Sequence, residues 1–345
     1  MTQAEGKPDE TTQNRALRWG VVGTGTIARR VMSDLLRLPD AELVAVASRS
    51  AERGQAFAAD LLVPEGGQRP TLAVFEQVAD MLPEIDVLYV ATPHPFHAAA
   101  ALPALESGTA VLVEKAITSR YADAVELVAA SRTHGSFLME AVWTRFTVLS
   151  TRARELIADG VLGDVMRIVA DFSFQFPPAD VEHRLWNPAL GGGALFDMGP
   201  YPVSLIQSLL GEPTELSVVG SLAGTGVDES VTLLMGYPNG AAGVATCSLR
   251  LDGPSSALVQ GTSGAQITLG PPLYNSERMT LHRPGRAPVE FLAETEGSGY
   301  LPQLREVQRG VRAGDIQSPV MPHDDTLAIL RVLTTAHARL GAVSA

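Results

Sequence analysis

The chain has 345 residues, of which 46% are hydrophobic, and a formal net charge of −12. This length predicts a globular protein of two domains, and the lack of a long apolar run argues against a membrane-spanning helix. The negative charge argues against nucleic acid and anionic membranes as partners. Cys247 is the single cysteine and the seven histidines lack ligand spacing, so neither a disulfide nor a metal site is expected. Residues 1–15 lack the apolar segment of a secretory signal, which predicts a disordered tail on a cytoplasmic protein.

Strands and helices alternate in the first half of the chain. Strands are expected at residues 17–22, 43–47, 85–91 and 110–114, and helices at 27–38, 51–62 and 96–107. This alternation is typical of a doubly wound parallel sheet. It predicts an α/β fold whose first unit is a nucleotide-binding Rossmann domain over residues 16–145.

The regular alternation of strands and helices ends at about residue 145. Helices are expected at residues 152–160, 200–210 and 324–340, and strands at 165–174, 215–220, 230–236, 243–251, 257–261 and 265–269. Turn signals such as Pro238-Asn239-Gly240 favour a mostly antiparallel or mixed sheet. Residues 146–345 are therefore expected to form an α+β domain for substrate binding and oligomerisation, with the last helix packing back on the first domain.

A glycine-rich turn joins the first strand to the first helix. In Gly23-x-Gly25-x-x-Ala28 the first glycine permits the tight turn, the second lets backbone amides approach a pyrophosphate, and the small third residue allows close packing. The alternative is a glycine-rich turn in an unrelated doubly wound domain. We assign the turn to a dinucleotide through five residues: Gly23, Thr24, Gly25, Thr26 and Ile27.

The end of the second strand indicates which dinucleotide binds. Ser48 and Arg49 stand where an NAD site usually has a carboxylate, and the next acidic residue is Glu52. A guanidinium and a hydroxyl can bind a 2′-phosphate that a carboxylate would repel. NADP is therefore preferred over NAD. Three arginines on the flanking helices are auxiliary ligands or solvated residues: Arg29, Arg30 and Arg53.

Lysine occurs only at Lys7 and Lys115, although arginine is plentiful. Lys115 follows the apolar run of residues 110–113 and Glu114, at the carboxyl end of a strand, where ligands bind in such sheets. A compact ammonium offers a pKa that moves on burial, which arginine does not. Chance placement is the alternative.

Two further peptides accompany Lys115. Thr92-Pro93 with His97 lies at the carboxyl end of the neighbouring strand. The peptide from Gly191 to Tyr201 comes from the second half, as expected for a substrate held between domains.

With the glycine turn and the peptide at residues 137–146, these motifs resemble the glucose–fructose oxidoreductase/inositol dehydrogenase (Gfo/Idh/MocA) family. The similarity is greatest to its branch of dimeric dihydrodiol dehydrogenases and NADP-dependent D-xylose dehydrogenases. The resemblance implies hydride transfer served by Lys115 and Tyr201. It also implies cofactor or substrate proximity for Thr92, Pro93, His97, Glu114, Trp143 and Arg145. One departure is Ala116, where the family usually has proline, and we expect a freer loop there.

The chemistry fits an alcohol–ketone interconversion. A tyrosine has a pKa of roughly 10, and an adjacent ammonium is expected to lower it towards the range of a useful base. Asp197 is expected to bind a substrate hydroxyl or orient Lys115, with a helix N-cap as the alternative. Tyr201 and Trp186 are expected at the substrate, and for each the alternative is a packed aromatic.

The sequence thus predicts an NADP-dependent oxidoreductase that interconverts a secondary alcohol and a ketone or lactone on a sugar or cyclic diol, in a homodimer or homotetramer. A sugar-nucleotide 3-ketoreductase of secondary metabolism and a non-catalytic NADP-sensing regulator are the alternatives. A redox-neutral glycosidase is disfavoured because no acidic residue stands at Ser48-Arg49. A short-chain dehydrogenase is disfavoured because no Tyr-x-x-x-Lys occurs.

Overall fold

The computed structural model describes residues 15–177 and 182–343, so the predicted disordered tail lies outside them except for Arg15. The first half forms a parallel sheet of six strands in the order β3-β2-β1-β4-β5-β6. Its strands are β1 (Leu17–Val22), β2 (Ala41–Ala47), β3 (Ala73–Phe75), β4 (Val87–Val90), β5 (Ala110–Glu114) and β6 (Leu138–Ala141). This is the doubly wound order, whose chain reversal between β1 and β4 opens a ligand crevice at the carboxyl ends of the strands.

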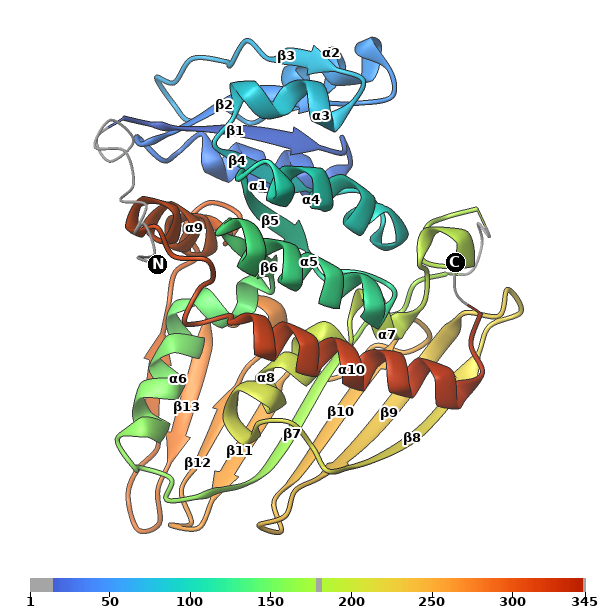
Figure 1. The fold of residues 1–345 in the computed structure, drawn as a ribbon. Helices are drawn as coiled ribbons and strands as arrows, with labels where there is room; N and C mark the ends of the chain where they lie inside the picture. Colours follow the sequence, from blue (N-terminus) through green and yellow to red (C-terminus); the bar gives the residue numbers. More distant parts are fainter. Residues whose placement is uncertain (1–14, 178–181, 344–345) are drawn as a thin grey trace, which may run out of the picture.

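Helices cover both faces of this sheet (Figure 1). They are α1 (Thr26–Leu35), α2 (Ala51–Asp60), α3 (Val78–Met81), α4 (His97–Glu106) and α5 (Tyr121–His134), with 3-10 turns η1 (Leu82–Glu84), η2 (His94–Phe96) and η3 (Trp143–Phe146). The sequence did not predict β3, β6 or α5. The two strands span only three and four residues, too few for an alternating pattern to stand out.

The second half builds a sheet of eight strands in the order β14-β13-β12-β11-β7-β10-β9-β8, in which only β7 and β10 pair in parallel. Its strands are β7 (Val165–Ser173), β8 (Glu215–Leu222), β9 (Asp228–Gly236), β10 (Ala242–Ser248), β11 (Ala257–Gly261), β12 (Gln266–Leu269), β13 (Arg278–His282) and β14 (Val289–Leu292). The predicted fold class, a Rossmann sheet followed by an α+β unit with a mostly antiparallel sheet, is confirmed.

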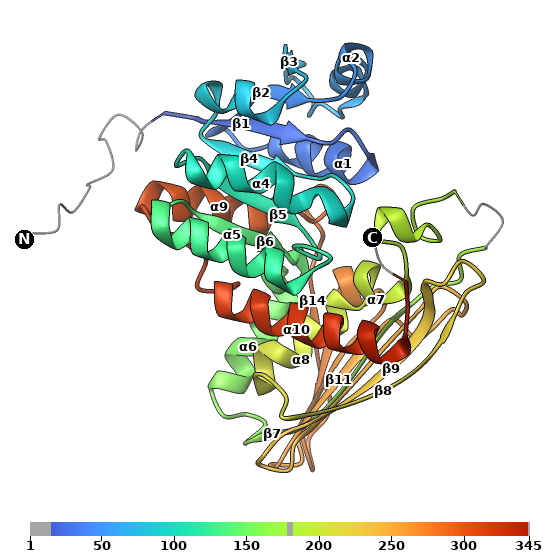
Figure 2. The ribbon, with the colours of Figure 1, turned by 45° about the vertical axis from the view of Figure 1, so that its right-hand side comes forward.

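Helices lie on one side of this second sheet and leave the other side open (Figure 2). They are α6 (Val148–Ala158), α7 (Ala194–Asp197), α8 (Pro200–Leu210) and α10 (His323–Leu340), with 3-10 turns η4 (Pro188–Leu190) and η5 (Leu273–Asn275). The remaining helix, α9 (Leu301–Ala313), lies against the first half of the chain. Helix α8 packs on β7 and β10, while α10 packs on α8 and also on α5 of the first half. None of the helices in the described ranges is long and apolar enough to cross a membrane.

Helix α9, which the sequence did not predict, returns to the first half and contacts α1. Its Gln308 amide donates to the Asp40 carbonyl at 2.7 Å. Just before α9, the backbone amides of Ser298 and Tyr300 donate to the buried Asp34 carboxylate of α1 at 2.9 to 3.0 Å. Hydrogen bonds from the second half of the chain therefore hold the helix that begins at the glycine turn.

Candidate active site

The glycine turn has the geometry that a dinucleotide needs. Gly23 has φ +101°, and a Cβ there would lie 2.5 Å from the Ala91 carbonyl oxygen, so only glycine fits. At Gly25 a Cβ would meet no atom within 4 Å, and no side chain caps the first turn of α1. The buried Thr92 hydroxyl oxygen has no hydrogen-bond partner in residues 15–177 and 182–343. This edge of the sheet therefore offers the uncapped amides of α1, free space at Gly25 and the unpaired Thr92 hydroxyl, which together fit a pyrophosphate.

The end of β2 lies open to solvent. Arg49 and Arg53 are exposed, and neither guanidinium forms a hydrogen bond or ion pair within the described parts of the chain. Ser48 Oγ accepts a hydrogen bond from the Ser50 amide at 3.4 Å, and Ser50 Oγ accepts one from the Arg53 amide to cap α2. Two unpaired cations and a hydroxyl, without a carboxylate on the strand end, fit a 2′-phosphate.

Three buried side chains hold the loop after Lys115. A ring nitrogen of His94 lies 3.1 Å from the Lys115 carbonyl oxygen, and one of His97 lies 3.1 Å from that of Ala116. The Ile117 amide donates to Glu140 Oε1 at 2.9 Å. The expectation of a freer loop at Ala116 is therefore wrong, because hydrogen bonds fix the backbone here in place of a proline ring.

The sequence did not mark His94 or Glu140 as part of the site. Their position could have indicated them, because Glu140 is a polar residue inside the apolar strand β6 and His94 follows the apolar strand β4 closely. Burial, with the neighbouring His97, lowers the pKa of His94 to about 3, and burial lowers that of His97 to about 4. Burial also raises the pKa of Glu140 to about 7. Both imidazoles are thus neutral at physiological pH and act through hydrogen bonds. The Lys115–Ala116 peptide bond is cis.

Lys115 meets Asp197 across the two halves of the chain. Its Nζ donates to the Asp197 carbonyl oxygen at 2.5 Å and lies 3.4 Å from Asp197 Oδ1. Arg184, which the sequence did not single out, donates to the same Oδ1 at 2.9 Å. Burial opposes ionisation of Asp197, but the charges of Lys115 and Arg184 outweigh it and hold the pKa of the carboxyl below its usual range. One carboxylate is therefore shared by two cations.

A buried carboxylate positions the short helix that carries Asp197. Asp228 Oδ2 accepts a hydrogen bond from the Leu195 amide at 2.6 Å, in the first turn of α7. Gly193 has φ +116°, and a Cβ there would come within 2.4 Å of Asp228 Oδ1. Asp228, on β9, thus takes the place of an N-cap. Asp197 is instead the last residue of α7 and faces Lys115, so the N-cap alternative for it is wrong.

Tyr201 stands in the first turn of α8, after Pro200. The Trp143 indole N–H donates to its hydroxyl oxygen at 3.3 Å, and Lys115 Nζ lies 5.0 Å from the ring centroid. Burial, followed by the charge of Glu114, raises the pKa of Tyr201 well above its ordinary value. The expected lowering by Lys115 is wrong for this arrangement, because the ammonium lies against the ring and hydrogen-bonds to Asp197.

Glu114 and a group of aromatic rings complete the site. Glu114 is buried, accepts from the Tyr89 hydroxyl at 2.6 Å and from the Lys115 amide at 3.3 Å. The Trp143 ring lies 4.7 Å from the Tyr300 ring, and the Phe172 ring lies 5.1 Å from the Tyr201 ring. These rings form an apolar surrounding in which the charges of Lys115 and Asp197 are poorly screened.

Two predicted site residues are packed elsewhere. Arg145 is 4% exposed and its guanidinium is fully engaged, with an ion pair to Asp325 and bonds to Ser204 and Gln207. It joins η3, α8 and α10 and has no donor left for a cofactor. Trp186 is 1% exposed and donates to the Pro177 carbonyl, which is the packed state that we gave as its alternative. No group of three His, Cys, Asp or Glu side chains in the described ranges could hold a metal ion.

Both halves of the chain match models of known protein families. Residues 17–142 match the family model described as an oxidoreductase family with an NAD-binding Rossmann fold, and residues 150–266 match the GFO/IDH/MocA C-terminal domain. The trans-1,2-dihydrobenzene-1,2-diol dehydrogenase of Mus musculus is 36% identical, over 94% of this chain and 97% of that protein. The chain belongs to the Gfo/Idh/MocA family.

Two further proteins are similar to this chain, one in sequence and one in fold. The D-xylose 1-dehydrogenase (NADP(+)) of Hypocrea jecorina is 33% identical over 93% of this chain and 91% of its own. The aldose-aldose oxidoreductase of Caulobacter crescentus shares the fold with a TM-score of 0.82, at 24% identity over 94% of this chain and 98% of its own. The prediction of an NAD(P)-binding oxidoreductase of this family is thereby confirmed.

Proposed function

We propose that this oxidoreductase uses NADP to interconvert a secondary alcohol and a ketone or lactone on a sugar or cyclic diol. The observation that carries the proposal is the cluster of Lys115, Asp197 and Tyr201 at the carboxyl end of β5, next to a turn that fits a pyrophosphate. The names of the relatives, a diol dehydrogenase and an NADP-linked xylose dehydrogenase, support the substrate class and the cofactor.

The chain's own residues would hold the cofactor in sequence along the crevice. The pyrophosphate would meet the amides of Thr24 to Thr26 and the hydroxyl of Thr92, and Ser48, Arg49 and Arg53 would meet the 2′-phosphate. The bound nicotinamide supplies the acceptor or donor of the hydride. No carboxylate on the end of β2 opposes the additional phosphate, which is why NADP is preferred over NAD.

Two groups would manage the charge and the proton on the substrate oxygen. The Lys115 ammonium stabilises the developing alkoxide. In the direction of reduction, Tyr201 gives its phenolic proton to that oxygen, and the indole N–H of Trp143 stabilises the phenolate left behind. Oxidation runs the same transfer backwards, with the proton passing from the substrate hydroxyl to a Tyr201 phenolate. The raised pKa of Tyr201 suits the first direction at neutral pH.

Arg184 would act as a positioning residue. Its guanidinium shares Asp197 Oδ1 with Lys115, so the carboxylate does not hold the ammonium alone. This balance lets the Lys115 ammonium move from the Asp197 carbonyl to a substrate oxygen at modest cost. The half-exposed Arg184 side chain also has further N–H groups free to bind a substrate hydroxyl.

A substrate screen tests the proposal. Aldoses, cyclic diols, keto-sugars and nucleotide-linked keto-sugars are each mixed with NADP(H) or NAD(H), and the nicotinamide absorbance is followed. Turnover of a free sugar or diol with NADP(H) is expected. Turnover of only the nucleotide-linked keto-sugar would favour the 3-ketoreductase alternative, and turnover of none of them would overturn the proposal.

We further propose that the open face of the second sheet joins two copies of the chain. On this face, one register row across the middle of the sheet is apolar. It consists of Leu234 on β9, Val244 on β10, Val169 on β7 and Leu258 on β11. Leu234 and Val169 are 51% and 38% exposed. An apolar row on a helix-free face supports a homodimer or homotetramer. Light scattering should show dissociation of Val169→Glu, and an unchanged mass would contradict this interface.

The cytoplasmic location of the protein stays a prediction.

A further inference from the structure

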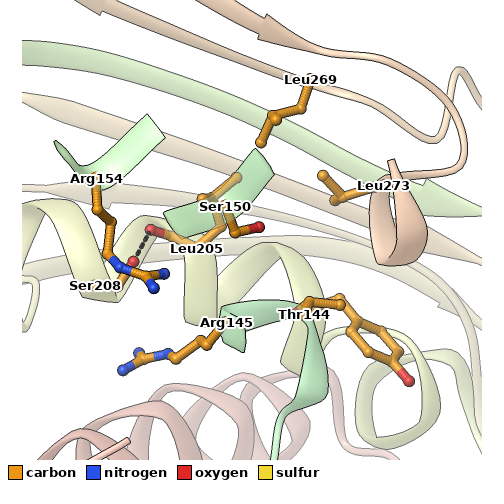
Figure 3. A pocket seen from close by; sticks show the side chains of 9 residues that line it. Thr144, Arg145, Ser150, Arg154, Leu205, Ser208, Leu269 and Leu273 are labelled. Atoms are coloured by element: carbon orange, nitrogen blue, oxygen red, sulfur yellow. Dashed lines mark hydrogen bonds between the residues drawn. The ribbon is translucent and has the colours of Figure 1, made fainter. Parts of the chain in front are cut away.

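A cationic pocket lies between η3, α6 and α8, adjoining Tyr201 (Figure 3). The space in it that a water-sized molecule can reach is about 20 Å³. Two guanidinium groups and four hydroxyls contribute to its wall, and no carboxylate does. The lining residues are Thr144, Arg145, Ser150, Arg154, Tyr201, Leu205, Ser208, Leu269 and Leu273.

The two arginines of this pocket differ in what neutralises them. Arg145 is paired with Asp325 at 2.5 Å. Arg154 has no ion pair in the described parts of the chain, and its guanidinium donates only to Thr151 Oγ1, at 3.2 Å. Figure 3 shows the Arg154 side chain among the residues that line the pocket, which include Ser208. In a chain with a net charge of −12, a half-buried arginine has been left without a counterion.

In the described parts of the chain, no nearby carboxylate forms an ion pair with Arg154. Glu155, on the same helix, pairs with Arg152 at 2.9 Å. Arg154 also borders a second groove towards α9, but the Glu306 carboxylate there accepts from Arg309 through both oxygens. Burial lowers the pKa of Arg154 and the charge of Arg145 lowers it further, whereas the charge of Glu155 offsets these effects only in part. The positive charge at Arg154 is therefore unfavourable until an anion joins it.

We propose that this pocket binds a small inorganic anion, from chloride to phosphate in size, with Arg154 as its principal ligand. The hydroxyls of Ser150 and Ser208 lie in the same wall. Ser208 Oγ donates to the Leu205 carbonyl oxygen at 2.8 Å and would turn from it to donate to the anion. The anion would replace the missing counterion and bridge α6 to α8. Tyr201 lines both this pocket and the proposed catalytic cluster, but the anion would be held by Arg154, so the proposed enzymatic function can fail without affecting the site.

Thermal unfolding of the full chain tests the site. Sodium chloride, sodium phosphate and sodium gluconate are compared at equal ionic strength and pH, because gluconate is too large for the pocket. The melting temperature should be about 2 °C higher in chloride or phosphate than in gluconate. The salt that gives the larger shift identifies the anion.

Arg154→Met should abolish this difference between salts. It should remain folded and be at least as stable as the parent in gluconate, because the repulsion by Arg145 is relieved. Arg152→Met is the matched control, two residues away on α6 but paired with Glu155, and it should keep the difference. Crystals soaked in bromide should show an anomalous peak beside the Arg154 guanidinium. Equal melting temperatures in all three salts, or a shift that Arg154→Met retains, would overturn the proposal.

Discussion

The Lys115 ammonium lies 5.0 Å from the centre of the Tyr201 ring, while it donates its hydrogen bond to Asp197. The two residues thus meet by face contact across the two halves of the chain. In this arrangement the lysine leaves the phenol protonated and stands ready to turn towards a substrate oxygen.

Removal of the ammonium should separate catalysis from cofactor binding. Lys115→Ala is expected to lower kcat by a factor of at least about 10² to 10³, since a charge that stabilises the alkoxide is lost. Binding of NADP, followed by protein fluorescence, should stay within about threefold of the parent. Retention of full turnover in this variant would contradict the role given to Lys115.

The raised pKa of Tyr201 predicts opposite pH profiles for the two directions. Reduction needs the phenol, so it should be rapid at neutral pH, whereas oxidation needs the phenolate and should rise with pH well into the alkaline range. Both are measured as kcat/KM between pH 6 and about 10. Tyr201→Phe should be slow at every pH and lose the alkaline rise. If the rate of oxidation by Tyr201→Phe still rose with pH, the proton acceptor would be another group.

Loss of Arg184 should change the titration of Asp197. With Asp197 left to Lys115 alone, the ammonium is held more strongly and the pKa of the carboxyl rises, so Arg184→Met should lower kcat about tenfold and move the acid limb of the reduction profile to higher pH. Arg184→Lys should restore part of both. Arg305→Met is a matched control, because Arg305 has the same 52% exposure and also pairs with a carboxylate. A lower kcat with an unmoved pH profile would leave Arg184 with a purely structural role.

Glu140 should make the protein less stable as pH rises. Its folded pKa, about 7, lies above its ordinary 4.5, so the stability it contributes is full below pH 4.5 and declines as pH rises through 7. Glu140→Gln keeps the acceptor for the Ile117 amide without the charge. Its advantage in unfolding free energy should grow from pH 5 to pH 8, reaching up to about 3 kcal/mol. Urea unfolding at pH 5 and pH 8 checks this. An equal change in unfolding free energy between the two pH values in Glu140→Gln and in the parent would refute it.

Discrimination between the dinucleotides should depend on Arg49. Arg49→Gln is expected to weaken NADP binding roughly tenfold to a hundredfold by the loss of a charged hydrogen bond, and to leave NAD binding almost unchanged. Arg286→Gln, at another exposed arginine without an ion pair in the described ranges, is the control. Calorimetric titration with each nucleotide gives both values. Tighter binding of NAD than NADP by the parent would overturn the cofactor proposal.

Much of the fold could be predicted because the signals were local. The bounds expected for the strand at residues 17–22 and the helix at 200–210 are those of β1 and α8. Helix α9 and strands β13 and β14 were missed. The last two strands are short and belong to the edge of the sheet, so their pairing partners, and not their own pattern, stabilise them.

The sequence by itself determined the chemical groups: a glycine turn for a pyrophosphate, a strand end without a carboxylate, one lysine in the body of the chain and a tyrosine after a glycine-rich peptide. Only the tertiary structure decided how they act, because contacts between residues far apart in the chain set burial and charge. The chain brings Arg184 to the Asp197 carboxylate and seats His94 on the Lys115 carbonyl. It also buries Arg145 and Trp186 away from the crevice and leaves Arg154 without a counterion.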